Sequence, residues 1–304
     1  MKSIEMPCKA GEPPGVRRSG GGRKISDLSP DLVRSLSKGE RATTTWTEWM
    51  AVNTGQLTFT VAGELPQGRL RQVLVDVSND LAGKGILERL NIVGRAVASA
   101  ADDVDDPAFQ HLVSHRSDAV RQWGAYAVNH RLRTEPLENL LKATLTFAAD
   151  PHMSVRECAW MAFRPHLLAR LDDGLYQLIE VAQSPDPRCR RFAVEVSRPR
   201  SVWGQHCTTL KTNPELGRPV LEAVKGELSR YVQLSVGNWL NDASKSRPDW
   251  VRALCERWSR DGNAETNWMA RRGLRTLTAR ALGDAPSNLQ PTFHQFVPLS
   301  PGGG

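Results

Sequence analysis

The sequence predicts an all-α protein, a solenoid of HEAT-like or armadillo-type helical repeats with a concave basic groove. Three observations support this fold. Apolar residues recur at three- and four-residue spacing through almost all of the central chain, as in RLRQVLVDVSNDL and PLENLLKATLTFA. A short pattern, a polar turn followed by an apolar helix, is repeated along the chain. The net charge of +7 over 304 residues favours an anionic partner.

The repeated pattern centres on Val120, Val155, Cys189 and Val232, and a looser fifth copy reads GNAETNWMARRGLRTL. The centres lie about 34 to about 43 residues apart, which is the range of helix-pair repeats. One helix pair cannot cover its own apolar face, so successive pairs are expected to stack and to present their second helices to a concave surface.

The domain prediction divides the chain into three parts. Residues 1–38 are expected to form a flexible basic tail, because they carry prolines, a Gly20–Gly22 run and basic pairs but few apolar residues near the start. Residues 39–282 form the repeat domain, and residues 283–304 form a second flexible tail rich in proline and glycine. Strand-like alternation is brief and is confined to QLTFTVAGEL.

Several classes of protein and site are disfavoured. No apolar run approaches the roughly 20 residues that a membrane span needs, and the first residues lack the apolar core of a signal peptide, so a cytoplasmic protein is expected. We also expect a monomer. The five cysteines are odd in number and scattered, which supports neither a disulfide framework nor zinc. Motifs for a serine or cysteine nucleophile, a helical metal site or a phosphate loop are absent from the sequence, so we expect no metal and no cofactor.

Basic residues gather where the second helices begin. Two interpretations remain open for them: contacts with DNA phosphates, or ion pairs with an acidic residue of the neighbouring repeat. The residues are Arg121, Arg156, Arg190, Arg191, Arg230, Arg271 and Arg272.

Two carboxylates stand out because of their surroundings. Glu195 ends an inner helix just before two arginines and Trp203, and Asp242 occupies the corresponding place one repeat later, beside Lys245. Stacked repeats bring such positions to roughly 10 Å from each other, so both carboxylates are expected to share one stretch of the groove. The structural alternative is that Glu195 pairs with a nearby arginine and that Asp242 holds the turn before the next helix.

Three segments carry a specific resemblance: EVSRPRSVW (195–203), SRYVQLSVGNWLNDASKSRP (229–248) and WMARRGLRTL (268–277). In sequence and order they resemble the AlkC branch of the AlkC/AlkD alkylpurine DNA glycosylases. The resemblance covers residues 147–280 most strongly, weakens over 39–146 and is absent from the tails. It implies a monofunctional glycosylase that removes cationic alkylated bases from duplex DNA without flipping them.

The resemblance also implies roles for individual residues. Glu195 and Asp242 fall on active-site carboxylate positions of the family, and Trp203 on an aromatic that faces the damaged nucleotide. The residues assigned to DNA binding are Trp160, Arg198, Arg200, Arg230, Asn238, Lys245, Arg271 and Arg275.

The chain departs from the family at one position. The family places a glutamate in an E-F-x-x-R-P stretch, where this chain reads WMAFRP with Trp160 at that point. Three explanations follow: Glu157, one helical turn away, takes over the role, the site works with two carboxylates, or the lesion preference differs. Some members carry a C-terminal immunoglobulin-like domain, and this chain is expected to be of the shorter form.

Two other functions fit the same sequence. Solenoids commonly serve as interaction surfaces, so a noncatalytic scaffold that binds DNA or a protein is one alternative. The other is a self-resistance glycosylase for bulky adducts of a DNA-alkylating natural product, in which Trp160 stacks on the adduct.

Overall fold

The regular structure of the described chain is entirely helical. The computed structural model describes residues 24–101, 103, 105–260 and 263–282, and no strand occurs among them. Within these residues, no helix combines the length and the apolar character that a membrane span requires. The all-α prediction is therefore confirmed for this part of the chain.

The α-helices are α1 (Pro30–Ser37), α2 (Trp46–Ala51), α3 (Thr54–Glu64), α4 (Arg69–Ser78), α5 (Ile86–Ala100), α6 (Pro107–Val113), α7 (Asp118–Arg131), α8 (Leu137–Ala148), α9 (Met153–Ala169), α10 (Leu171–Val181), α11 (Pro187–Val196), α12 (Thr208–Thr212), α13 (Arg218–Ala223), α14 (Arg230–Ser244), α15 (Pro248–Arg260) and α16 (Ala264–Ala281). Short 3₁₀ helices lie at Ile25–Asp27, Asn79–Leu81 and Pro214–Gly217.

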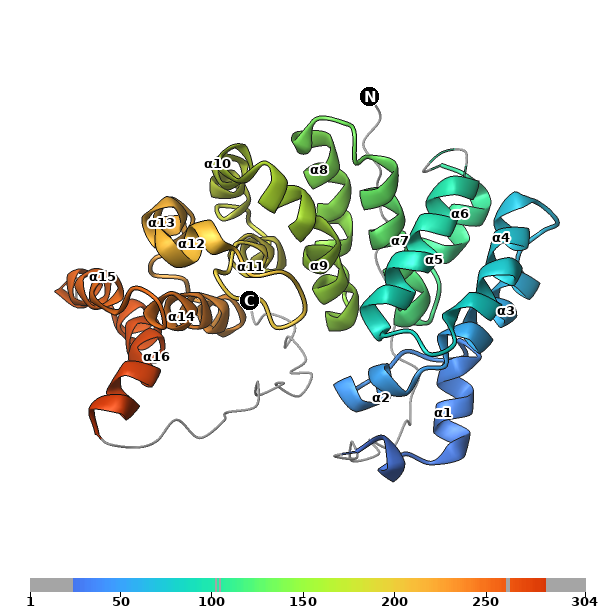
Figure 1. The fold of residues 1–304 in the computed structure, drawn as a ribbon, viewed down its shortest axis with the longest axis horizontal. Coiled ribbons are helices and arrows are strands. Elements are labelled where there is room, and N and C mark those ends of the chain that lie inside the picture. Colours follow the sequence, from blue (N-terminus) through green and yellow to red (C-terminus); the bar gives the residue numbers. More distant parts are fainter. Residues whose placement is uncertain (1–23, 102, 104, 261–262, 283–304) are drawn as a thin grey trace, which may run out of the picture.

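The helices form an arch of stacked layers (Figure 1). Helices α5, α7, α9, α11, α14 and α16 pack side by side in chain order and form the inner row. Helices α4, α6, α8, α10 and α15 each pack against the inner helix that follows them and form the outer row. The predicted stacking of helix pairs is thus confirmed for the described residues, and the concave basic groove stays a prediction.

The repeated sequence pattern coincides with the inner row. Val120, Val155 and Val232 lie in α7, α9 and α14, and each is fully buried. Cys189 lies near the start of α11, and the fifth copy forms α16. Because the apolar side of an inner helix is covered by both of its neighbours, its core residues recur once in every repeat.

Two glycines permit the close packing of this row. A Cβ on Gly94 of α5 would lie 2.3 Å from the Cβ of Tyr126 on α7. A Cβ on Gly237 of α14 would meet the side chain of Arg272 on α16 at 2.8 Å. Larger residues at either position would force the neighbouring helices apart.

The structure corrects two expectations about local structure. The boundary of the N-terminal tail at residue 38 is too late, because Pro30–Ser37 form α1, capped by Ser29, and Leu36 is buried. QLTFTVAGEL belongs to α3, because Leu57 and Val61 are one turn apart and both are buried. The tails proper, 1–23 and 283–304, lie outside the described residues.

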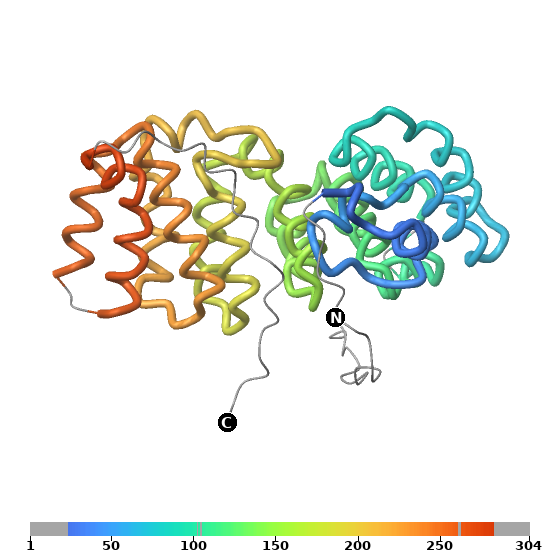
Figure 2. Tube along the Cα trace, turned by 90° about the horizontal axis from the view of Figure 1, so that it is seen from below, coloured from blue at the N-terminus to red at the C-terminus, as the bar shows by residue number. Residues whose placement is uncertain are grey.

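A buried carboxylate holds the N-terminal segment against the inner row. Asp118, at the start of α7, is fully buried and accepts hydrogen bonds from the backbone N–H and hydroxyl of Thr43 at 2.7 and 2.8 Å. It also accepts a hydrogen bond from Ser154 on α9, and His152 contacts the Thr43 carbonyl oxygen at 2.7 Å. Figure 2 shows the resulting course of the blue N-terminal segment in front of the helices of the first repeats.

Replacing Asp118 with alanine should therefore destabilise the fold strongly. The change leaves several buried donors without an acceptor, and we expect a loss of about 3 kcal/mol in the free energy of unfolding. Urea denaturation at neutral pH measures this loss. The control is Asp249→Ala, because the Asp249 side chain is 94% exposed and pairs with Arg252 one turn away. Equal losses in both variants would contradict the anchoring role of Asp118.

Candidate active site

A line of alternating charges crosses three inner helices. Arg191 of α11 contacts Glu157 of α9 at 2.6 Å and Glu195 of its own helix at 3.6 Å. Arg198, just beyond α11, contacts Glu195 at 3.0 Å and Asp242 of α14 at 2.7 Å. The predicted proximity of Glu195 and Asp242 is confirmed, because one guanidinium group touches both carboxylates.

Glu195 is buried, with 4% of its surface exposed, and is nevertheless ionised. Burial alone would raise its pKa, but the guanidinium groups of Arg198 and Arg191 and hydrogen bonds from Ser235 and Arg198 lower the pKa to about 2. The Ser235 hydroxyl donates to Oε1 at 2.6 Å. Glu195 therefore carries a fixed negative charge at physiological pH.

Asp242 is buried, and its carboxylate contacts one largely buried and one exposed basic side chain. Its Oδ2 accepts a hydrogen bond from Arg198 Nε at 2.8 Å, and its Oδ1 lies 3.2 Å from Lys245 Nζ. The Lys245 side chain is 38% exposed, whereas the Asp242 side chain is 6% exposed. One carboxylate oxygen thus pairs with the Arg198 guanidinium group, and the other pairs with the amine of the more exposed Lys245.

Two arginines, Arg198 and Arg200, bind the groups around Asp242. The acidic partners Glu195 and Asp242 raise the pKa of Arg198 despite its burial. Arg200 donates to the Ser246 hydroxyl at 2.8 Å and lies 3.4 Å from the Asp242 carbonyl oxygen. Both arginines, expected to hold phosphates, therefore also bind groups of the protein.

The loop after α11 is shaped by a buried arginine that sequence reasoning missed. Arg164 of α9 is 1% exposed and donates to the carbonyl oxygens of Val196, Arg198 and Gln205 at 2.5, 2.7 and 2.8 Å. Burial lowers the pKa of Arg164 to about 10, so it remains charged. The Arg-Pro pair that follows Trp160 in WMAFRP was the available signal for this residue.

Trp203, carried by this loop, meets two aromatic residues of α2. Its ring stacks on Trp46 with centroids 5.9 Å apart and planes at 27°, and it meets Trp49 edge-on at 5.8 Å. The sequence offered no signal for these contacts, because α2 and the loop lie far apart in the chain.

Trp160 does not present a free face. Its side chain is buried, and its indole N–H donates to Glu157 Oε2 at 2.7 Å. The structure therefore places Trp160 as a support for Glu157 rather than as a stacking surface, because buried rings contact other side chains. Glu157 joins the line of charges through Arg191.

The other residues assigned to DNA binding lie on α14 and α16 or beside them. Arg230 is exposed and covers the Trp268 ring at 3.8 Å. Asn238 accepts a hydrogen bond from Arg275 at 3.1 Å, and burial lowers the pKa of Arg275 to about 10. Arg271 is exposed on α16.

The open question about the arginines at the helix starts has a partial answer. Arg121 binds Asp150 in bidentate fashion at 2.9 and 3.0 Å. Arg190 binds Glu227 in the same way at 2.5 and 2.9 Å. For these two residues, and for Arg191 with Glu157 of α9, the interpretation as ion pairs between neighbouring repeats is confirmed.

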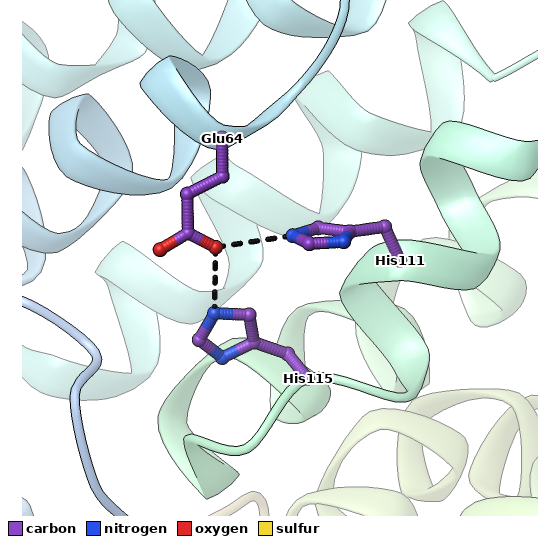
Figure 3. Close-up of side chains that lie close together, drawn as sticks. All are labelled: Glu64, His111 and His115. Carbon is purple, nitrogen blue, oxygen red and sulfur yellow. Dashed lines mark hydrogen bonds and ion pairs between the residues drawn. The ribbon is translucent and has the colours of Figure 1, made fainter.

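A second polar cluster lies away from this site. His111 and His115 each place Nε2 near the same oxygen of Glu64, at 3.1 and 3.0 Å (Figure 3). The backbone N–H of Ser117 donates to Nδ1 of His115, which places the proton of neutral His115 on Nε2, facing Glu64. A metal-ligating histidine usually donates from its other nitrogen instead. The cluster is therefore a hydrogen-bonded link between α3 and α6.

The low pKa of Glu195 predicts a specific dependence of stability on pH. Since the folded pKa of about 2 lies below the ordinary value of 4.5, the stabilisation is complete above pH 4.5 and is lost as the pH falls towards 2. The stability gap between wild type and Glu195→Gln should be constant from neutral pH to about 5 and should narrow below that by up to about 1.4 kcal/mol per pH unit.

Urea denaturation at a series of pH values measures this gap. Glu138→Gln is the control, because Glu138 is exposed on the outer helix α8 and its variant should match wild type throughout. A gap for Glu195→Gln that does not change with pH would contradict the ionised, arginine-held state of Glu195.

Comparisons with known proteins fit this architecture. No family model matches the sequence. A segment of 116 residues is 36% identical to the uncharacterized protein YhaZ of Bacillus subtilis strain 168, covering 38% of this chain and 32% of YhaZ. Among solved structures, the alkylpurine DNA glycosylase AlkC of Pseudomonas fluorescens, bound to DNA containing an abasic site analog, matches with a TM-score of 0.63 and 22% identity.

The structural match to AlkC covers most of this chain and part of the AlkC chain. It covers 85% of this chain and 66% of the AlkC chain, so this protein spans about two thirds of AlkC and about a third of YhaZ. The TM-score of 0.63 shows a common architecture, and the identity of 22% leaves the chemistry to be argued from the site. The chain has the helical-repeat fold of the alkylpurine DNA glycosylase AlkC.

Proposed function

We propose that this protein is a DNA glycosylase that hydrolyses the N-glycosidic bond of cationic alkylated bases, such as N3-methyladenine, in duplex DNA. The observation that carries this proposal is the pair of buried carboxylates, Glu195 and Asp242, joined by Arg198 on adjacent inner helices. The likeness to AlkC, whose solved structure contains DNA with an abasic site analog, supports duplex DNA as the partner.

A carboxylate pair suits this reaction because the cationic base leaves without protonation by a general acid. A purine alkylated at a ring nitrogen carries a positive charge, and it leaves with the electron pair of the C1′–N bond as a neutral base. The sugar then becomes an oxocarbenium-like cation, which a nearby negative charge stabilises. Water adds to C1′ and releases a proton to the solvent, which completes the hydrolysis without a resident metal or cofactor.

The two carboxylates contribute differently. With a pKa of about 2, Glu195 is a weak base and acts through its fixed charge and by orienting Arg198. We assign Asp242 to the sugar and to the orientation of the attacking water, because its Oδ1 pairs with the side chain of Lys245, which is 38% exposed. When a DNA phosphate draws Lys245 away, that oxygen becomes available to the reacting nucleotide.

The surrounding residues complete the proposed site. Trp203 attracts the cationic base through its ring face, a contact worth roughly 0.5–2 kcal/mol. Lys245 pairs with Asp242 at 3.2 Å, and we assign it to a DNA phosphate rather than to attack on the sugar. The proposed reaction therefore releases the base without cutting the strand.

A noncatalytic DNA-binding scaffold is the second candidate. One observation favours it: both oxygens of Glu195 and both oxygens of Asp242 already have partners within the protein. Such a network can serve stability alone. Trp160 occupies the position where the resemblance led us to expect a further glutamate, which fits the same alternative.

Base release from methylated duplex DNA, followed chromatographically, separates these candidates. Wild type should release N3-methyladenine in preference to the uncharged base uracil, and Asp242→Asn and Glu195→Gln should each reduce the rate by about 10²–10³. Asp249→Asn is the matched control, because that carboxylate is exposed on outer helix α15. No release by wild type would support the scaffold, and wild-type rates in both variants would make the carboxylates structural.

The dependence of DNA affinity on salt tests the proposed phosphate contacts. The logarithm of affinity should fall with the logarithm of salt concentration by about 0.9 for each phosphate neutralised. Lys245→Ala should weaken binding to all sequences similarly and flatten this slope by about one unit.

Lys142→Ala, on the outer helix α8, should leave the slope unchanged. Equal slopes for wild type and Lys245→Ala would remove Lys245 from the interface, and a slope near zero for wild type would contradict DNA binding through phosphates.

A further inference from the structure

Three arginines near the contact of α14 with α16 have no acidic partner within the described residues. They are Arg230, which begins α14, and Arg272 and Arg275, which lie one turn apart on α16 at the end of the inner row (Figure 1). By contrast, Arg191 and Arg198 each contact two carboxylates. Positive charge is therefore offset around α11 and left without an internal counter-charge at α16.

The two arginines of α16 are half-buried and are held by neutral oxygens. Asn238 Oδ1 accepts hydrogen bonds from Arg275 at 3.1 Å and from Arg272 at 3.4 Å. Arg275 also donates to the carbonyl oxygens of Gly237 at 3.2 Å and of Arg272 at 2.7 Å. Among the residues that the structure describes, Nε of Arg272 is buried without a hydrogen-bond partner. A neutral amide thus occupies the place where a carboxylate would neutralise both groups.

The surface of α14 is shaped to accept these side chains. A Cβ on Gly237 would lie 2.8 Å from two carbons of the Arg272 side chain, so the aliphatic part of Arg272 lies directly on the α14 backbone. The guanidinium carbons of Arg230 and Arg272 lie 3.8 and 5.6 Å from the centroid of the Trp268 ring. A ring face orients a guanidinium group without removing its charge.

The arginine charges oppose one another in the free protein. Burial, together with the charge of Arg272, lowers the pKa of Arg275 to about 10. Burial and the charge of Arg230 lower the pKa of Arg272. Both groups stay charged at neutral pH, because arginine is an exceptionally strong base. Like charges that are partly withdrawn from water are unfavourable unless an anion offsets them, so this cluster gains stability when an anion binds.

We propose that Arg272 and Arg275 form a binding site for one backbone phosphate beside the damaged nucleotide. This inference rests on the proposed function for its partner, duplex DNA, and deepens it by naming one phosphate contact and the residue that keeps the site open. That residue is Asn238, because its neutral amide holds both arginines without cancelling their charge.

The position of the arginines identifies the phosphate. Asn238 lies one helical turn before Asp242 on α14, and the charge of Asp242 acts on Arg275. Asp242 is the group assigned to the sugar, and every sugar within a strand has a phosphate on either side. A phosphodiester offers two free oxygens and one negative charge, which suits a pair of guanidinium groups.

Asn238→Asp tests the site by supplying an internal anion. The new carboxylate should pair with both arginines, so resistance to urea should hold or rise while DNA binding weakens. The probe is a duplex containing a tetrahydrofuran abasic nucleotide, which has no base to release. Affinity should fall by about tenfold, the effect of losing one charged hydrogen-bonded contact, and the salt slope should flatten by about one unit.

The control for added charge is Asn139→Asp, because Asn139 is exposed on outer helix α8. Its affinity and salt slope should match wild type. Wild-type affinity and slope in Asn238→Asp would overturn the proposal.

Single methylphosphonate linkages, which are neutral, locate the phosphate. In wild type, one linkage beside the abasic nucleotide should cost about tenfold in affinity when it is neutralised. Asn238→Asp should lose little more at that linkage and should respond like wild type at the others, because the two changes remove the same contact. If Asn238→Asp does not fold, Arg275→Gln takes its place with the same expected pattern.

Losses that add at every linkage would overturn the site. Base release from methylated duplex separates this inference from the proposed function. No release by wild type, together with a linkage-specific loss, would refute the glycosylase and leave the phosphate site standing. Release by wild type, together with additive losses at every linkage, would refute the phosphate site alone.

Discussion

The guanidinium group of Arg198 is the interaction on which the site depends. Glu195 and Asp242 are both 4% exposed, and two buried carboxylates on neighbouring helices would repel each other without a cation between them. Arg198 contacts both carboxylates at 3.0 Å or less. Its positive charge offsets their repulsion, and the two ion pairs connect α11 with α14. The same arrangement keeps two negative charges in a protein proposed to bind an anionic duplex.

Two further buried charged residues, Asp118 and Arg164, position the segments that lie beside the Arg198 ion pairs. Asp118 fixes the segment that leads into α2, and Arg164 fixes the loop that carries Trp203. Each belongs to an inner helix, so the row that forms the core of the solenoid also positions the groups at its edge. Buried charges of this kind are costly unless fully bonded, and here each has several partners within the protein.

The sequence predicted what depends on local pattern and missed what depends on contacts across the chain. The repeated apolar pattern located the inner helices, and the basic surroundings of Glu195 and Asp242 identified the carboxylate pair. The contact between Trp46 and Trp203 joins segments that no repeat relates, so periodicity could not reveal it. The partners of Arg121 and Arg190 could not be predicted either. A row of arginines has the same sequence pattern whether it binds DNA phosphates or acidic residues of the neighbouring repeat.

The most direct test of the proposed chemistry is to measure rate and affinity together on Asp242→Asn. If Asp242 stabilises a sugar cation while facing phosphates, the substitution should slow release of N3-methyladenine by about 10²–10³ while affinity for undamaged duplex holds or rises. A deleted negative charge and a released Arg198 both favour the anionic partner. Parallel loss of rate and affinity, or no loss of rate, would contradict this role of Asp242.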